Sequence, residues 1–374
     1  MKKKVIAAGL ICIDMTPVFA DRKVERIEEL LVPGNLVEIG EAEVHTGGSV
    51  ANTGLGMKIL GADVSLMGKI GRDAYGSMVM KVLDQYDAGK NMLVTEGEST
   101  SYTIVLAIPG IDRIFLHNPG ANNTFGAEDV PQEALKDAAL FHFGYPSLMK
   151  RMYENDGDEL VYMMTRVWEA GVATSLDMAA VSEGSEAAKI SWRRLLERVL
   201  PLVDFFVPSV EELCYMLDPE RLAEWKKRAG NKDITEVLDV EKDIRPLADE
   251  CMRMGAKVLL IKSGAPGIYY RTAKEEVIGQ ISERLELDAH AWADKEGFEL
   301  SFVPDVVRSG TGAGDTSIAA FLTAMLEGCS IEECVQLAAA TGACCVSAYD
   351  ALSGLRSFDE LRERIRKGWA KRQR

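Results

Sequence analysis

The stretch SGTGAGDTS, residues 309–317, places an aspartate directly after a glycine-rich turn and before the apolar run IAAFLTAML. Glycine permits tight turns and close approach to the backbone, so the N–H groups that begin the following helix can cradle an anion. The helix dipole favours a negative charge on Asp315. Such a carboxylate can accept a hydroxyl proton while the cradle holds the oxygens of a transferring phosphoryl group. The alternative is that Asp315 only caps the helix.

A second glycine-rich turn, Gly47-Gly48-Ser49-Val50-Ala51-Asn52, leads into the apolar stretch TGLGMKILGA. Two adjacent glycines before a helix let backbone amides and the Asn52 side chain reach a polyhydroxylated ligand. The alternative is a tight turn with a capping asparagine. The motif G-x-G-x-x-G is absent from SGTGAGDTS, and neither Gly-Lys pair, at 68–69 or 89–90, is followed by the Ser or Thr of a P-loop.

Strand-like and helix-like stretches alternate along most of the chain. Amphipathic stretches with helical spacing, such as 128–137, 154–170 and 243–254, separate the strand-like runs, which are VIAAGLICID, DVSLMGKIG, ALFHFGYP, VATSLDMA, FFVPS and KVLLIKSG. This alternation predicts a parallel sheet covered by helices on both faces. From Thr316 onward we expect helices only. The polar insertions 218–243 and 272–300 are expected to decorate the surface, with no role assigned.

Two segments break the alternation and predict a small sheet that covers the cleft. Residues 15–46 contain a charged helix-like stretch, RKVERIEELL, and then lead into LVEIGEAEVHTGG, whose alternation fits a half-exposed strand. Residues 97–118 predict a hairpin around Pro109-Gly110-Ile111-Asp112. We therefore divide the chain into a main α/β domain, residues 1–13, 46–96 and 119–374, and a β lid, residues 14–45 and 97–118.

Composition and charge limit the class of partner. The 374 residues are 47% hydrophobic and 27% charged, which fits a folded globular protein. The net charge of -15 argues against nucleic acid or an anionic membrane as partner, because both would repel the chain. Seven cysteines without a C-x-x-C pair and four scattered histidines indicate reduced thiols in the cytoplasm and no structural zinc.

The first 20 residues have two interpretations. Three lysines followed by VIAAGLICI resemble a signal peptide, but Asp14 and Pro17 interrupt the apolar run. We favour a buried first strand. No run along the chain approaches the 18 apolar residues of a membrane span.

Taken together, the two glycine-rich turns resemble those of the ribokinase-like (PfkB) carbohydrate kinase family. GGSVAN is followed by a helix and by three spaced glycines, and TGAGD comes roughly 260 residues later, in the order and spacing of that family. The resemblance runs over nearly the whole chain. It implies a three-layer α/β/α fold with a central, mostly parallel sheet and a small β-sheet lid. It also implies a kinase that uses ATP and Mg²⁺ to phosphorylate a primary hydroxyl of a small sugar or sugar-like molecule.

The resemblance also assigns roles to residues that react with or bind the acceptor. Asp315 corresponds to the family's base. The anion hole corresponds to the backbone amides of Gly312, Ala313 and Gly314. The acceptor would be bound by Asp14 at the end of the first strand, by the second glycine-rich turn and by the PGAN element, and the residues implied are Asp14, Gly47, Gly48, Asn52 and Asn122.

On the nucleotide side, the resemblance implies a strand-end glycine loop, a late helix and the element N-x-x-E. Glu212 of that element would organise Mg²⁺ through water. The nucleotide-binding residues implied are Ser209, Glu212, Lys262, Gly264, Gly267, Thr311 and Thr341.

The chain departs from the family pattern at three places. Ser209 replaces the asparagine of N-x-x-E, which puts the Mg²⁺ arrangement in doubt. Ser309-Gly310 stands where many members have Asp-Thr, an element that helps to bind an activating cation, so dependence on K⁺ stays open. No acidic residue near Tyr145 matches the one that contacts ribose in ribokinases, so ribose is not assumed to be the acceptor.

Two other functions stay open. A nucleoside kinase on the same fold would need an aromatic wall, for which the chain offers Phe115, Phe125, Phe143 and Tyr145. A sugar sensor without catalysis is suggested by the substitutions at Ser209 and Ser309. The exposed edge of the lid also predicts a homodimer through the lid, and the alternative is that the helix-like RKVERIEELL covers that edge.

Overall fold

The structure is a computed structural model and describes residues 2–19, 24–111 and 114–373. Its strands are β1 Lys4–Gly9, β2 Cys12–Pro17, β3 Ala42–Gly47, β4 Asp63–Met67, β5 Lys69–Gly71, β6 Leu93–Thr95, β7 Tyr102–Leu106, β8 Ile114–Asn118, β9 Ala138–Gly144, β10 Ala173–Asp177, β11 Phe205–Phe206, β12 Val258–Ser263, β13 Gly267–Thr272 and β14 Glu296–Leu300. Its helices are α1 Gly56–Ile59, α2 Ala74–Asp84, α3 Gln132–Lys136, α4 Lys150–Glu169, α5 Trp192–Val199, α6 Val210–Leu217, α7 Pro219–Ala229, α8 Arg245–Arg253, α9 Glu275–Ile278, α10 Ala289–Trp292, α11 Ala313–Leu326, α12 Ile331–Cys345 and α13 Phe358–Arg366.

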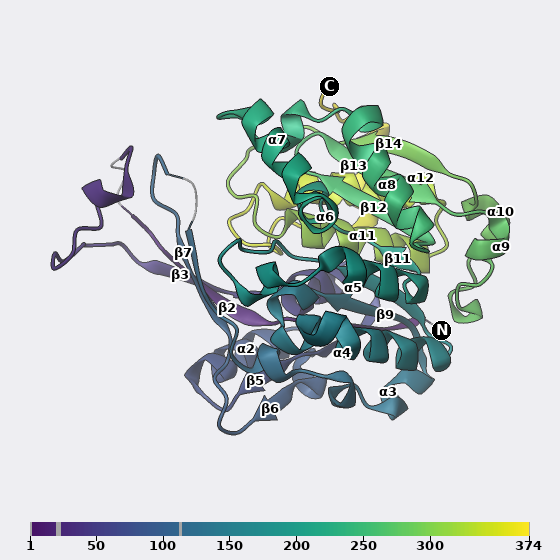
Figure 1. Cartoon of the computed structure of the whole chain (residues 1–374), viewed down its shortest axis with the longest axis horizontal. Coiled ribbons are helices and arrows are strands. Elements are labelled where there is room, and N and C mark those ends of the chain that lie inside the picture. Colours follow the sequence, from purple (N-terminus) through teal and green to yellow (C-terminus); the bar gives the residue numbers. More distant parts are fainter. Residues whose placement is uncertain (1, 20–23, 112–113, 374) are drawn as a thin grey trace.

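The large sheet has the order β14-β13-β12-β11-β10-β9-β1-β4 within the described chain (Figure 1). The strands from β12 to β4 pair in parallel, whereas β13 and β14 pair antiparallel at one edge. Each of the six apolar runs of the sequence supplies a strand, and the three amphipathic stretches overlap α3, α4 and α8. The predicted α/β fold with a mostly parallel sheet is therefore confirmed.

Alternate side chains of each central strand enter different layers of the core. In β1, Val5 and Ala7 pack with α11 and α12, whereas Ile6 and Ala8 pack with α4 and α5 on the other face. Successive side chains of a strand point to opposite faces, so a strand buried on both faces must be apolar throughout. This explains why β1 has the sequence KVIAAG.

The smaller sheet has the order β3-β2-β7-β8 and projects from the large sheet on the left of Figure 1. It draws its strands from both segments that we assigned to the lid, so the predicted separate β-sheet is present. The assignment of residues 14–45 and 97–118 to a lid domain stays a prediction, and β2 begins two positions before that boundary, at Cys12. Asp112 of the predicted turn lies outside the described residues.

Of two local expectations for the first lid segment, the helix is wrong, whereas the strand is present over its second half as β3. The described part of RKVERIEELL, from Val24 onward, contains only a 3₁₀ turn at Ile27–Glu29, and residues 36–41 of LVEIGEAEV are irregular until β3 begins at Ala42. Most of residues 25–44 are exposed or half-buried. A short amphipathic segment that stays largely exposed gains too little from burial to offset the cost of helix nucleation.

The polar insertions are more than surface decoration, which corrects our expectation. Residues 218–243 contain α7, whose Trp225 is 2% exposed and belongs to the core. Residues 272–300 end in β14, the edge strand of the large sheet, and bring Trp292 against Phe205 and Phe321. The apolar residues that reach the core are few and spread along otherwise polar segments, so the sequence pattern did not indicate this packing.

From Thr316 onward the named elements are helices, as expected. Residues 315–325 of α11 are all buried, because this helix lies between the sheet and its neighbours. None of the helices in the described ranges combines the length and apolar character needed to cross a bilayer.

Candidate active site

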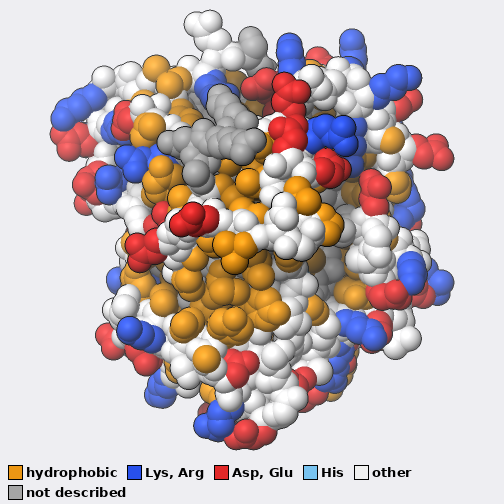
Figure 2. Space-filling view, turned by 90° about the vertical axis from the view of Figure 1, so that its left-hand side faces the viewer, with side chains coloured by type: hydrophobic (Ala, Val, Ile, Leu, Met, Phe, Trp, Pro, Cys, Tyr) orange, Lys and Arg blue, Asp and Glu red, His pale blue; other side chains and the backbone are white. Residues whose placement is uncertain are grey.

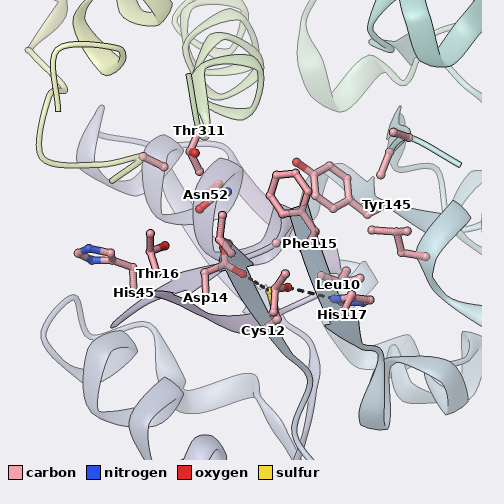
Figure 3. Close-up of a pocket in the computed structure, with 18 of the residues that line it drawn as sticks. Leu10, Cys12, Asp14, Thr16, His45, Asn52, Phe115, His117, Tyr145 and Thr311 are labelled. Atoms are coloured by element: carbon pink, nitrogen blue, oxygen red, sulfur yellow. Dashed lines mark hydrogen bonds between the residues drawn. The ribbon is translucent and has the colours of Figure 1, made fainter. Parts of the chain in front are cut away.

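A pocket of about 1200 Å³ lies between the small sheet and the carboxyl ends of the parallel strands. Ligands of open α/β sheets bind at this edge. Figure 3 shows that Asp14 on β2, Asn52 and Tyr145 come from separate elements and surround the same space. The predicted site residues that line this pocket are Asp14, Gly48, Asn52, Thr311, Gly312 and Asp315.

Asp315 occupies the first turn of α11 and does not cap it. The N-cap is Gly312, which makes no side-chain bond to the first amides of the helix. Instead Asn52 Nδ2 donates to Asp315 Oδ2 at 2.9 Å, and the Tyr145 hydroxyl donates to Asp315 Oδ1 at 2.6 Å. Asp315 is 4% exposed yet lines the pocket. The interpretation of Asp315 as a mere helix cap therefore does not hold.

The turn before α11 depends on glycine. Gly312 has φ of 74°, a left-handed conformation that side chains disfavour, and a Cβ at this position would overlap Ala351. The Ala313 amide makes only a long bond of 3.4 Å to Gly310 O. The amides of Gly312, Ala313 and Gly314 thus begin a buried helix beside Asp315, which is the geometry that anion binding needs.

Asn52 lies in a π-helical turn, Val50–Leu55, that continues into α1. Such turns shift side chains out of the regular helical spacing and are frequent at functional sites. Gly48, with φ of 84°, precedes this turn and approaches the backbone of Leu10 too closely for a side chain. The second glycine-rich turn therefore aims Asn52 at Asp315.

Asp14 lies on β2, opposite His45 of β3. The Cys12 thiol donates to Asp14 Oδ1 at 3.4 Å. A Cβ on Gly47 would overlap the Asp14 carboxylate, so Gly47 provides the room that this side chain occupies. Burial raises the pKa of Asp14, with a smaller contribution of the same sign from Asp315.

Asn122 is placed differently from what we expected for an acceptor-binding residue. It is fully buried, its Nδ2 donates to Ile11 O at 2.9 Å, and its Oδ1 accepts from Ile11 N at 3.2 Å. These bonds fasten the connection between β1 and β2. Contact of Asn122 with an acceptor stays a prediction, whereas its neighbour Asn123 lines the pocket.

Ser209 and Glu212 form a capping box at the start of α6. Ser209 Oγ accepts from the Glu212 amide at 3.3 Å, and Glu212 Oε2 accepts from the Ser209 amide at 2.8 Å. One carboxylate oxygen of Glu212 is thus used locally. The role of Glu212 toward Mg²⁺ stays a prediction.

Lys262, near the end of β12, is bonded to Asp177 at the end of β10. Lys262 Nζ lies 2.7 Å from Asp177 Oδ1. Burial lowers the pKa of Lys262, but Asp177, Glu212 and Asp315 more than offset this, so its pKa lies above the ordinary value and Lys262 stays charged. Burial raises the pKa of Asp177, against the opposing influence of Lys262.

The other nucleotide-side predictions are spread over three elements. Gly264 and Gly267, with φ of 56° and 147°, form the tight turn between β12 and β13. Thr341 on α12 is fully buried, and its hydroxyl donates to Leu337 O at 2.8 Å within the helix. Thr311 lines the pocket. The contacts of these residues with a nucleotide stay predictions.

The sequence pattern of the pfkB family carbohydrate kinases matches residues 7–357. The chain belongs to this family. The predicted enzyme class, a carbohydrate kinase, is thereby confirmed.

Relatives of the family are similar over most of their length. An uncharacterized sugar kinase of Archaeoglobus fulgidus is 25% identical over 309 residues, which is 82% of this chain and 100% of the relative. The structure of Arabidopsis thaliana ribokinase complexed with ribose and ATP has a TM-score of 0.69 at 20% identity, and covers 97% of this chain and 98% of that one. A putative ribokinase II of E. coli in complex with ATP and Mg²⁺ also has a TM-score of 0.69 at 20% identity, covering 98% and 99%.

The sequence of this pfkB family member did not indicate the contacts of two site residues, one in the pocket and one at the end of a strand. Tyr145, considered only as an aromatic wall, holds Asp315 and adopts φ of 69° directly after β9. Asp177 was overlooked although it ends the buried strand β10, and a polar residue at that edge of a parallel sheet is a signal for a site. Neither contact can be read from local sequence, because the partners lie far apart in the chain.

Proposed function

We propose that the chain transfers the γ-phosphoryl group of ATP to a primary hydroxyl of a small sugar or sugar-like molecule, with Mg²⁺ as cofactor. The observation that carries this proposal is the position of Asp315. Asp315 lies in the first turn of a buried helix and lines a pocket that a small molecule can enter. Two hydrogen-bond donors orient its carboxylate. Membership of the pfkB family supports the class of reaction.

In the proposed reaction, Asp315 takes the proton from the acceptor hydroxyl as its oxygen bonds to the γ-phosphorus. The bond between that phosphorus and the bridging oxygen breaks, and ADP leaves with the electron pair. Amides of Gly312, Ala313 and Gly314 stabilise the transferring oxygens. Bound Mg²⁺ supplies further neutralisation of phosphate charge, and Glu212 is the residue that we assign to it through water.

Asp14 is proposed to hold other hydroxyls of the acceptor. It faces the same pocket as Asp315, together with His45, Thr103 and His117. Donors and acceptors of this kind, set among apolar side chains, fit a polyhydroxylated molecule that must be oriented before it reacts.

A nucleoside acceptor has less support from the geometry. Of the aromatic residues considered for a base-binding wall, Phe115 and Tyr145 line the pocket. Phe125 and Phe143 instead stack on each other in the core, with 0% exposure. If Phe115 and Tyr145 formed such a wall, Tyr145 would have to contact the base of the nucleoside while its hydroxyl stays bonded to Asp315.

The proposal also covers the cellular compartment and the oligomeric state of the protein. All seven cysteines lie in the described ranges and are free thiols, which is the state favoured by a reducing cytoplasm. We therefore propose a cytoplasmic enzyme that acts on a small molecule rather than on nucleic acid or membrane. A homodimer through the lid is proposed from its exposed apolar residues.

ADP release from ATP and Mg²⁺ across sugars, sugar acids, polyols and nucleosides tests the function. Each acceptor is offered with and without K⁺, because Ser309 stands at the departure from the cation-binding pattern. We expect a strong response to one class of sugar. Silence across the whole set, combined with thermal stabilisation by a sugar, would contradict catalysis and favour a sensor.

A further inference from the structure

Two buried Lys–Asp pairs lie at opposite ends of β12. Lys257, directly before β12, pairs with Asp204 at 2.5 Å, and Lys262, near the end of β12, pairs with Asp177 at 2.7 Å. All four side chains are at most 13% exposed. Because the strands are parallel, only the Lys262 pair lies at the edge where ligands bind.

The Lys257 pair is satisfied within the fold. Asp204 Oδ1 accepts from Lys257, and Asp204 Oδ2 accepts from the Thr174 amide at 2.9 Å and from the Thr174 hydroxyl at 3.4 Å. A buried ion pair persists when additional hydrogen bonds satisfy its remaining atoms. This pair therefore joins strands and needs no other partner.

The Lys262 pair is not satisfied in the same way. Asp177 Oδ2 is buried, and none of the described residues bonds to it. Asp177 is fully buried, whereas the Lys262 side chain keeps 13% of its surface exposed. An ammonium carries three donors, so Lys262 can bind an additional acceptor without leaving Asp177. Spare donors at the ligand-binding edge therefore distinguish the Lys262 pair from the Lys257 pair.

Lys262 also points toward the start of α11. Val258 and Leu260 of β12 pack on the α11 side of the sheet, and Lys262 continues that alternation. A Cβ on Gly314 would lie 3.5, 3.6 and 3.7 Å from Lys262 Cδ, Cε and Nζ. The ammonium thus lies against the first turn of α11, one residue before Asp315.

We propose that Lys262 is a catalytic residue, whose ammonium contacts a non-bridging oxygen of the γ-phosphoryl group during transfer. This inference rests on the proposed function. Lys262 keeps its protons throughout, and its charge offsets the negative charge on the phosphoryl oxygens while Asp177 holds the side chain in place. Asp177 is accordingly a positioning residue.

Lys262→Met tests the proposal, with Lys257→Met as the matched control. Each variant leaves one buried aspartate without its cation, so both are expected to lose stability. The pairs Lys262→Met/Asp177→Asn and Lys257→Met/Asp204→Asn remove the stranded charge and keep the measurement possible. We expect the Lys262 variants to lose about 10²- to 10³-fold in kcat, as for other preorganised donors, and the Lys257 variants to keep the parent kcat per folded molecule.

A binding measurement separates this inference from the proposed function. Isothermal titration compares the Kd values of ATP and ADP, both with Mg²⁺, for the parent and the Lys262→Met/Asp177→Asn variant. Loss of a charged contact to the γ-phosphate should lower the preference for ATP over ADP by about tenfold or more. This result stands even if no acceptor has been found. An unchanged preference, or a kcat within about threefold of the parent, overturns the role of Lys262.

Discussion

Asn52 and Asp315 are 263 positions apart in the sequence, and their side chains meet through a hydrogen bond of 2.9 Å from Asn52 Nδ2 to Asp315 Oδ2. The bond joins the two glycine-rich turns. Tyr145 holds the other carboxylate oxygen. Asp315 therefore has a fixed orientation before any ligand binds, which is the preorganisation that a base requires.

Asn52→Ala should lower kcat by up to about 100-fold, because a reacting group displaced by about 1 Å loses that much. The fold should persist, since the change removes one bond to a pocket residue. Steady-state kinetics with the best acceptor measures the effect. Asn123→Ala is the matched control, because Asn123 lines the same pocket but accepts from the Lys150 amide. Equal kcat in both variants would contradict a positioning role for Asn52.

Gly312→Ala should destabilise the chain by about 1–3 kcal/mol or more and abolish turnover. The new side chain would adopt a φ of 74° and overlap Ala351, which would displace the start of α11. Thermal unfolding and ADP release measure both losses. Gly310→Ala is the control two residues earlier, because a Cβ there meets nothing within 4 Å. Similar melting temperatures for the two variants would argue against a demand for glycine at position 312.

His142 should make stability fall as the pH is lowered. Burial lowers the pKa of His142 to about 3, and the positive charge of Lys262 adds to this. The unfolded state, with an ordinary pKa near 6.5, therefore binds more protons below that pH, so the free energy of unfolding decreases as pH falls toward 3. Between pH 7.5 and 5.5 the contribution is about 1.4 kcal/mol.

Urea unfolding of His142→Gln at these two pH values measures that contribution. The variant should lose less stability than the parent on going from pH 7.5 to 5.5. His45→Gln, whose histidine is 44% exposed in the lid, serves as control. The same pH-dependent loss in His142→Gln and in the parent would show that His142 is not buried in its neutral form.

The lid should mediate a homodimer. Figure 2, seen from the side where the lid projects in Figure 1, shows hydrophobic side chains gathered on this face. Leu36 is 93% and Leu116 51% exposed. Large exposed apolar areas mark interaction sites. Light scattering should give the mass of two chains for the parent and of one for Leu116→Glu.

Trp168→Glu controls for the introduced charge, because Trp168 is 54% exposed on α4 rather than on the lid. A monomeric parent at micromolar concentration would rule out the dimer. A dimer that survives Leu116→Glu would locate the contact elsewhere on the surface.

Local patterns predicted the elements that position the site. The run IAAFLTAML after TGAGD indicated α11, and apolar runs such as ALFHFGYP indicated the strands of the large sheet. Because these segments are buried, their apolar patterns identify them unambiguously. The alternating LVEIGEAEVHTGG predicted β3 correctly only over its second half, because residues 36–41 are largely exposed and an alternating pattern without packing does not determine a conformation.

Local sequence patterns could not predict the contacts between these elements. The bonds from Tyr145 and Asn52 to Asp315 depend on the backbone at residues far apart, including the positive φ of Tyr145 and the π-helical turn around Asn52. The resemblance to the family implied that Asp14 and Asp315 belong to one site, and both line the same pocket. It gave no indication that the Lys262 side chain lies against Gly314.

Asp315→Asn tests the proposed base most directly. Phosphoryl transfer is followed as ADP release with the best acceptor, alongside the thermal stabilisation that the acceptor and ATP cause. Asp350→Asn is the control, because Asp350 also lines the pocket but accepts from the amides of Leu352 and Ser353 in its own turn. We predict that Asp315→Asn binds both ligands and loses about 10²- to 10⁴-fold in kcat, whereas Asp350→Asn keeps most of its turnover. Turnover by a folded Asp315→Asn variant within a few-fold of the parent would contradict the role of Asp315 as the base.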